Sequence, residues 1–259
     1  MTSFNLRSLL AILLLPATLA HSAEGEPAAV LPYRPSLSTP AQLPVPGQLE
    51  LEFGGLHSKT GSVQRDSLPY QFKLAFNPQW GILLNGEAVV STRDSGTNDG
   101  RISGVGDTNL VLKRAFIVDD ATAFGLELGV KLPTARDNIG SGRADYIVNT
   151  IFSRDLGSVH MDANLNFTRV GLVDAGTGSV QTGLSFAFSH AVTEQFTVTG
   201  ELSGNRRSAT PSTAQALVAL SYSPTKQLTF DIGISHGLNA ASLNYALFAG
   251  VVIPVARLF

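Results

Sequence analysis

The sequence contains no cysteine, which excludes disulfide bonds, thiolate zinc sites and cysteine nucleophiles. Charged residues make up only 15% of its 259 residues, below the roughly 25% usual for soluble domains. No apolar run reaches the roughly 20 residues that a membrane-spanning helix requires. The formal net charge is −2, and no cluster of lysine and arginine marks a nucleic-acid-binding surface. Low charge without long apolar runs is typical of alternating strands that meet lipid on one face.

The beginning of the chain has the parts of a secretory signal peptide. Arg7 supplies the positive charge, and Leu9 to Leu15 form a short apolar core. Small residues follow, so cleavage after Ala20 or after Ala23 satisfies the rule for signal peptidase sites. We therefore expect residues 1–23 to be removed on export and to take no part in the fold.

Residues 24–46 are rich in proline. Because proline has no backbone N–H, it cannot donate to a β-ladder. The composition predicts an extended, weakly ordered lead-in on the periplasmic side, ahead of a folded domain at 47–259.

From residue 47 onward, apolar and polar residues alternate with period two. In the clearest segment, Leu126, Leu128 and Val130 alternate with Glu127 and Lys131, so the two sets face opposite sides of a sheet. Twelve such segments, of a length that suits tilted membrane-crossing strands, follow one another. They are residues 48–56, 69–76, 80–91, 104–116, 122–132, 144–154, 159–168, 180–189, 195–202, 213–222, 228–235 and 243–259.

Two of these segments need comment. The third places Trp80, Leu84 and Val90 on one apolar face. The sixth is ambiguous, because Ile147 and Ile151 interleave with apolar residues of the other parity. An even strand number is the rule for single-chain bacterial barrels, so twelve is predicted, with ten as the alternative if the first or sixth segment does not span the membrane.

Short and long connections also alternate along the chain. Short turns are predicted at 77–79, 118–121, 155–158, 191–194 and 223–226, and longer loops at 57–68, 92–103, 133–143, 171–178, 204–212 and 236–242. Short periplasmic turns and longer external loops are typical of transmembrane barrels. The predicted fold is therefore all-β, a single antiparallel up-and-down transmembrane β-barrel with both ends in the periplasm.

Aromatic residues flank four of the short turns, as an interfacial girdle requires. The flanking pairs are Phe76 with Trp80, Phe116 with Phe124, Phe188 with Phe196, and Tyr222 with Phe230. Arg114 does not fit the pattern, because its parity places it on the lipid face near the periplasmic end.

Three motifs resemble a known family. They are Gly104-Val105-Gly106-Asp107-Thr108-Asn109-Leu110, then Val130-Lys131-Leu132-Pro133-Thr134, and the lead-in Leu43-Pro44-Val45-Pro46-Gly47-Gln48. In this order they resemble the outer-membrane family labelled "putative MetA-pathway of phenol degradation", often called simply "transporter". The resemblance implies a barrel in the outer membrane of a Gram-negative bacterium that passes small organic solutes, and it suggests phenolic ones.

The chain ends in Phe259, on a strand that sets Val251, Ile253 and Val255 at alternate positions. A terminal phenylalanine on such a strand resembles the signal read by the outer-membrane assembly machinery, although Arg257 interrupts the alternation. The expected partners are this machinery, outer-membrane lipid and a small-molecule solute.

The parity of the strands also predicts which polar side chains line the lumen. The predicted set is Glu50, Glu52, Lys73, Glu87, Asp107, Lys113, Glu127, Lys131, Asp145, His160, Asp162, Glu201 and Asp231. Nine are acids and three are lysines, a formal 3 − 9 = −6. Two interpretations remain open: a polar pore biased against anions, or a plugged structural barrel whose acids pair with lysines.

An outer-membrane lipid-modifying hydrolase is the alternative of another class. By parity, His190 is the one histidine predicted to face outward, beside Ser189. Adjacent residues on a strand face opposite ways, so these two cannot form a nucleophile–base pair. Asp94, Asn98 and Asp99 in one external loop do not match an EF-hand. We therefore predict neither an enzyme nor a cofactor or metal site.

Overall fold

The computed structural model describes residues 28–96, 100–135 and 139–259, so the predicted signal peptide lies outside the described residues. These residues form strands, turns and bends. Within them, no helix has the length and apolar character to cross a membrane.

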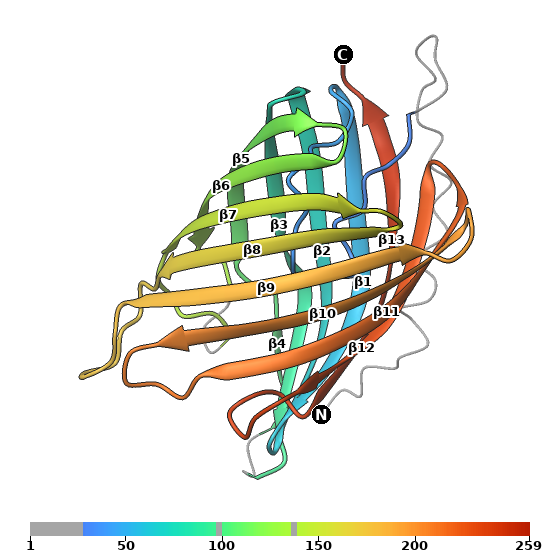
Figure 1. Cartoon of the computed structure of the whole chain (residues 1–259). Helices are drawn as coiled ribbons and strands as arrows, with labels where there is room; N and C mark the ends of the chain where they lie inside the picture. The colour runs from blue at the N-terminus through green and yellow to red at the C-terminus, as the bar shows by residue number, and fades with distance from the viewer. Residues whose placement is uncertain (1–27, 97–99, 136–138) are drawn as a thin grey trace.

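The strands form one closed antiparallel barrel (Figure 1). They are β1 Gln48–Thr60, β2 Val63–Asn77, β3 Trp80–Asp94, β4 Ile102–Gly104, β5 Thr108–Asp119, β6 Thr122–Leu132, β7 Asp145–Leu156, β8 Val159–Arg169, β9 Val180–Ala191, β10 Phe196–Arg207, β11 Thr213–Thr225, β12 Leu228–Gly237 and β13 Tyr245–Arg257. The sheet closes because β1 pairs with both β2 and β13. Since β4 and β5 both pair with β3, they are two parts of one interrupted strand, and the predicted all-β barrel of twelve strands is confirmed.

The interruption coincides with a β-bulge that changes which residues face inward. Between β4 and β5, the amide of Gly106 donates to the carbonyl of Glu87 at 2.9 Å. On β3 the pairing with β2 passes from Glu87 to Val89, which leaves Ala88 as an extra residue. A bulge of one residue reverses the alternation beyond it. The placement of Val90 on the outer face with Trp80 is therefore wrong: Val90 is 1% exposed and faces the interior.

The first external connection is also shorter than predicted. Instead of a loop at 57–68, β1 and β2 continue to a tight turn at Gly61 and Ser62, where Gly61 adopts a φ of 57°. Glycine tolerates this left-handed conformation, which lets two residues join the strands. As a result His57 and Arg65 lie on strands, and the parity of β1 makes His57 outward-facing, contrary to the prediction. His236 likewise falls within β12 on the outward parity.

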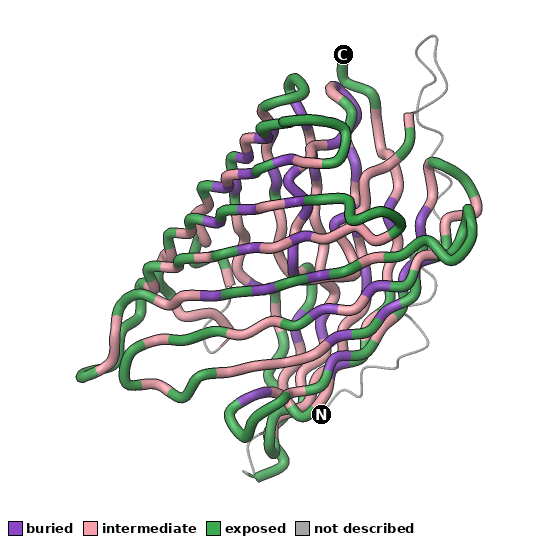
Figure 2. Tube along the Cα trace, in the orientation of Figure 1, coloured by how far each residue is buried: buried purple, intermediate pink, exposed green. Residues whose placement is uncertain are grey.

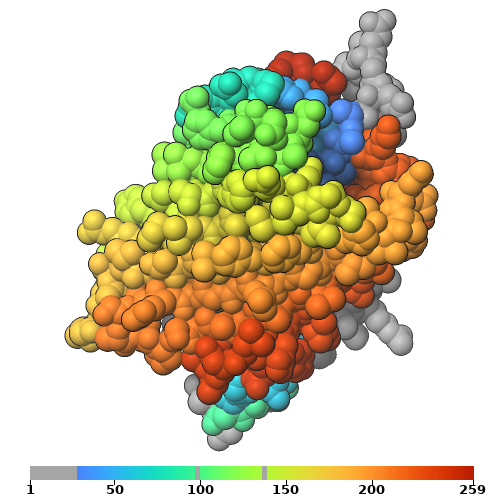
Figure 3. Space-filling model, in the orientation of Figure 1, coloured from blue at the N-terminus to red at the C-terminus, as the bar shows by residue number. Residues whose placement is uncertain are grey.

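The outer wall presents apolar side chains, and buried and exposed residues alternate along its strands (Figure 2). Leu202, Val218 and Ile232 are 57%, 58% and 62% exposed, as lipid-facing residues should be. Figure 3 shows one side of the barrel, where β6 to β11 lie side by side.

Aromatic rings gather near the short turns, as predicted. Phe196 and Tyr222 stack across β10 and β11 with ring centroids 4.8 Å apart. Arg114 lies among these rings, with its guanidinium carbon 4.8 Å from the Trp80 ring centroid and 4.7 Å from that of Phe116. Cation–π attraction explains how a charged residue is held on this face near the membrane boundary.

Residues 28–46, here named the lumen segment, lie inside the barrel. Tyr33, Ser38 and Ala41 are buried. The segment enters beside the β11–β12 turn, where the amide of Val30 donates to the carbonyl of Lys226, and it leaves through Gly47, whose amide donates to the carbonyl of Ala75. The prediction of a weakly ordered segment outside the barrel is wrong for these residues. The backbone is extended, as expected from its prolines. Backbone N–H groups of the segment donate hydrogen bonds to acceptors on the inner wall.

Contact with the lumen segment explains which residues of the ambiguous sixth predicted strand, β7, face inward. Ile151 is buried and packs with Ala41 of the segment and Ala123 of β6. The inner wall of β7 is therefore partly apolar, since it covers an apolar part of the segment.

Candidate functional site

Carboxylates of the inner wall hold the backbone of the lumen segment. Glu52 accepts from the amide of Tyr33 at 2.7 Å, and one oxygen of Glu201 accepts from the amides of Leu37 and Ser38, each at 2.8 Å. Glu50 accepts from the amide of Leu31 at 3.2 Å. Hydrogen bonds to a charged acceptor are stronger than neutral ones, so these carboxylates fix the path of the segment.

Two buried lysines contact the ring of Tyr33. Lys73 Nζ lies 3.0 Å from Glu50 and 2.6 Å from Glu52, and Lys113 Nζ lies 3.0 Å from Glu127. Both ammonium groups face the Tyr33 ring, at 4.4 and 4.2 Å from its centroid. Burial raises the pKa of the Tyr33 phenol well above its ordinary value, so the hydroxyl stays protonated and donates to the carbonyl of Gln42.

Arg34 fastens the lumen segment to β12, which is separated from β1 by β13 alone. Its Nε and Nη2 lie 2.9 and 3.0 Å from the two oxygens of Asp231, a bidentate pair. The guanidinium occupies space left by Gly54 and Gly250, and a Cβ at Gly250 would lie 2.5 Å from Arg34 Nε. Glycine at these positions therefore leaves room for the guanidinium of the docked segment.

The remaining predicted lumen residues pair with one another or with newly found partners. Glu87 pairs with Arg65 at 2.5 Å. Lys131 contacts Asp145 at 2.8 Å and Asp107 at 3.4 Å. His160 lies 3.2 Å from Asp162 and 2.5 Å from Asp155. Each of the nine predicted acids thus has a lysine, arginine, histidine or backbone N–H partner.

Arg34 and Arg65 were not among the predicted lumen residues. Arg34 falls in the lead-in that was expected outside the barrel, and Arg65 falls in the predicted first external loop. Continuing the alternation of the second segment backward past Pro69 would have placed Arg65 on the lumen face.

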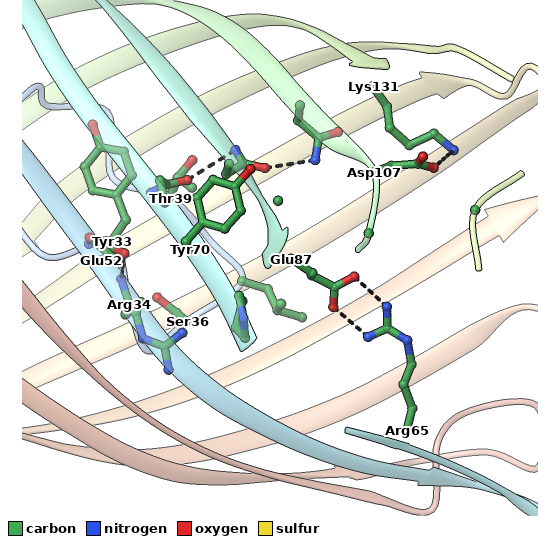
Figure 4. A pocket seen from close by; sticks show the side chains of 18 of the residues that line it. Tyr33, Arg34, Ser36, Thr39, Glu52, Arg65, Tyr70, Glu87, Asp107 and Lys131 are labelled. Carbon is green, nitrogen blue, oxygen red and sulfur yellow. Dashed lines mark hydrogen bonds and ion pairs between the residues drawn. The ribbon is translucent and has the colours of Figure 1, made fainter. Parts of the chain in front are cut away.

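A cavity of about 530 Å³, here named the external cavity, lies between the lumen segment and the strands β2, β3, β5 and β6 (Figure 4). Arg65 and Glu87 line it, as do Lys131 and Asp107. The amide side chains of this cavity form hydrogen bonds with one another: Asn109 Nδ2 donates to Asn85, and Asn85 Nδ2 donates to Gln71.

A second cavity of about 560 Å³, here named the periplasmic cavity, lies near the short turns. Serine and threonine hydroxyls of β9 to β12 form much of its lining, including those of Ser189, Thr199 and Ser221. Tyr33, Arg34 and Ser36 line both cavities. These residues of the lumen segment therefore separate the two spaces.

The histidines do not form a nucleophile–base pair with serine in the part of the chain that the structure describes. His57 Nδ1 lies 2.7 Å from Asp66, and the residue paired with Asp66 on its other side is Ser91, so the carboxylate stands between the histidine and the serine. Across residues 28–96, 100–135 and 139–259, no group of three potential metal ligands occurs. Asn98 and Asp99 of the external loop lie outside these ranges.

Comparison with solved structures supports the barrel assignment. The COG4313 outer membrane channel from Pseudomonas putida F1 superposes with a TM-score of 0.63 and 16% identity, covering 90% of this chain and 100% of that one. The NanC porin gives a TM-score of 0.57 at 10% identity, covering 79% and 100% of the two chains. A KdgM porin in complex with disordered oligogalacturonate gives 0.53 at 9% identity, covering 80% and 99%. These likenesses show the fold.

Comparison with curated proteins gave no match. A family model with the description "Putative MetA-pathway of phenol degradation" matches residues 34–254, which include most of the lumen segment and nearly all of the barrel. The chain therefore belongs to this family of outer-membrane β-barrels.

Proposed function

We propose that this protein is a passive outer-membrane channel for small solutes, and that displacement of the lumen segment opens it. The observation that carries this proposal is the position of Tyr33, Arg34 and Ser36 between the external and periplasmic cavities. A shift of these residues would join the two cavities into one path through the barrel.

The pairing of the charged side chains supports small uncharged solutes as the cargo. In the external cavity Arg65 and Lys131 are each paired with carboxylates, so a charged solute meets no unpaired countercharge there. The family description points to phenolic compounds, which are uncharged near neutral pH. The structural neighbours described as channels and porins are consistent with this proposal.

Conductance in planar bilayers tests the proposal. The protein should conduct ions weakly, and Arg34→Ala should raise the conductance severalfold, because it removes the bidentate contact that holds the segment to Asp231. Arg101→Ala is the matched control, since Arg101 pairs with Asp66 among exposed side chains. Swelling of phenol-loaded vesicles tests the solute class.

Absence of conductance in both the unaltered protein and Arg34→Ala would reject the channel. An equal increase for Arg34→Ala and Arg101→Ala would reject the lumen segment as the barrier.

A further inference from the structure

A third space, here named the amide pocket, lies beside Leu37 of the lumen segment and has a volume of about 230 Å³. Five amide side chains from β7, β8, β10 and β11 line it, together with serine and threonine hydroxyls. The amides are Asn149, Asn164, Asn166, Asn205 and Gln215. Its lining contains no ionisable side chain. The volume is below the roughly 300 Å³ at which sites for drug-sized ligands begin, so the pocket suits a smaller solute.

One of these amides has an unused acceptor. Asn149 is 6% exposed, and its Nδ2 donates to Glu127 at 2.9 Å, while its Oδ1 has no hydrogen-bond partner. The amide cannot rotate to satisfy this oxygen, because a flip would place Oδ1 against the Glu127 carboxylate. Asn149 Oδ1 is itself buried, and buried polar atoms are nearly always hydrogen-bonded, so an acceptor left unpaired in the wall of this pocket indicates a missing donor.

The lumen segment fixes the neighbouring amide. Asn164 Oδ1 accepts from the amide of Thr39 at 2.8 Å, and its Nδ2 donates to the carbonyl of Thr39 at 2.9 Å. Asn149 Nδ2 also contacts Asn164 Oδ1 at 3.4 Å. The docked segment therefore orients Asn164 and Glu127 orients Asn149, so the pocket is formed before any solute arrives.

We propose that the amide pocket binds a small uncharged hydroxyl compound, whose O–H group donates to Asn149 Oδ1, and that it is a solute-selective site of the channel. This inference rests on the proposed channel function. A charged solute is disfavoured, because it would lose hydration in a pocket that offers no countercharge. A hydroxyl compound is favoured, because amides and hydroxyls offer both donors and acceptors to it.

Block of single-channel current tests this site with two matched probes. Glucose should interrupt the current in a concentration-dependent way, whereas glucuronate, which differs by a carboxylate, should do so far more weakly. Asn149→Leu should raise the half-blocking glucose concentration about tenfold, the effect of one lost hydrogen bond. Asn85→Leu is the control, because it makes the same change in the external cavity, and it should leave glucose block unchanged.

Phenol run in parallel distinguishes an aromatic from an aliphatic hydroxyl source. Block by either compound that Asn149→Leu weakens and Asn85→Leu does not supports the site. If Asn149→Leu does not yield the heat-modifiable migration of a folded barrel, Gln215→Leu on β11 replaces it, with the same direction expected.

Equal block by glucose and glucuronate would overturn the inference, as would equal effects of Asn149→Leu and Asn85→Leu. So would conductance that neither glucose nor phenol blocks, and this result would leave the proposed channel intact. Complete absence of conductance would instead reject the channel itself.

Discussion

The external cavity and the amide pocket are neighbours built from different chemistry. Leu37 lines both of them. In the external cavity, charged side chains such as Arg65 and Glu87 pair with each other, and the amides of Asn85 and Gln71 form a hydrogen bond. In the amide pocket charge is absent, and an oxygen of Asn149 is left without a donor.

This difference separates two tasks within one lumen. Ion pairs fix the wall and the lumen segment in place, because breaking a buried pair leaves an uncompensated charge. Uncharged side chains remain available to exchange hydrogen bonds with a passing solute.

The largest effect is expected where the charged side is most deeply buried. Lys73 is fully buried and serves both Glu50 and Glu52. Lys73→Met should lower the free energy of unfolding by about 3 to 5 kcal/mol, because two carboxylates lose their cation. Guanidinium unfolding in lipid vesicles, followed by Trp80 fluorescence, measures it.

Lys131→Met is the control for this experiment, because Lys131 is partly exposed and water can reach its partner carboxylates. Equal unfolding midpoints for Lys73→Met and the unaltered protein would show that the buried cluster contributes little to stability.

A second test displaces the lumen segment without removing a charge. Gly250→Val should raise conductance severalfold, because a Cβ at this position would collide with the Arg34 guanidinium. Gly55→Val is the control, since a Cβ there meets no atom within 4 Å. Unchanged conductance for Gly250→Val would contradict the role of the glycine cradle.

The smallest effect is expected from unbalancing the external cavity. Arg65→Ala leaves Glu87 without its cation, so the reversal potential across a potassium chloride gradient should shift toward cation preference. Asn205→Ala, in the amide pocket, alters no charge and should leave the reversal potential in place. A shift toward anion preference for Arg65→Ala would mean that other side chains set the field.

Local alternation was sufficient to predict the barrel, since the facing of Leu126, Glu127 and Leu128 depends only on the period of a strand. It failed where contacts come from distant parts of the chain. Ile151 faces inward because Ala41 covers it. Val90 faces inward because a bulge at Ala88 shifts the register.

The lumen segment could not be predicted from composition for the same reason. Its prolines indicate an extended backbone, but not where that backbone lies. Its position depends on acceptors such as Glu201, which is 163 residues from Ser38 in the sequence. The unpaired oxygen of Asn149 could not be predicted either, because the orientation of this amide depends on the carboxylate of Glu127 on the neighbouring strand.

The closed seam between β1 and β13 has a consequence for kinetics. Arg34 and Asp231 are 197 residues apart, and joining such distant points of an unstructured chain costs about 5 kcal/mol of loop-closure entropy. In the finished barrel, Val252 pairs with Glu52 on one side and with Thr229 on the other, so the walls that receive Arg34 are already adjacent. Only a short tether then has to be ordered. A segment released from the lumen should therefore rebind quickly, and each opening of the channel should be brief.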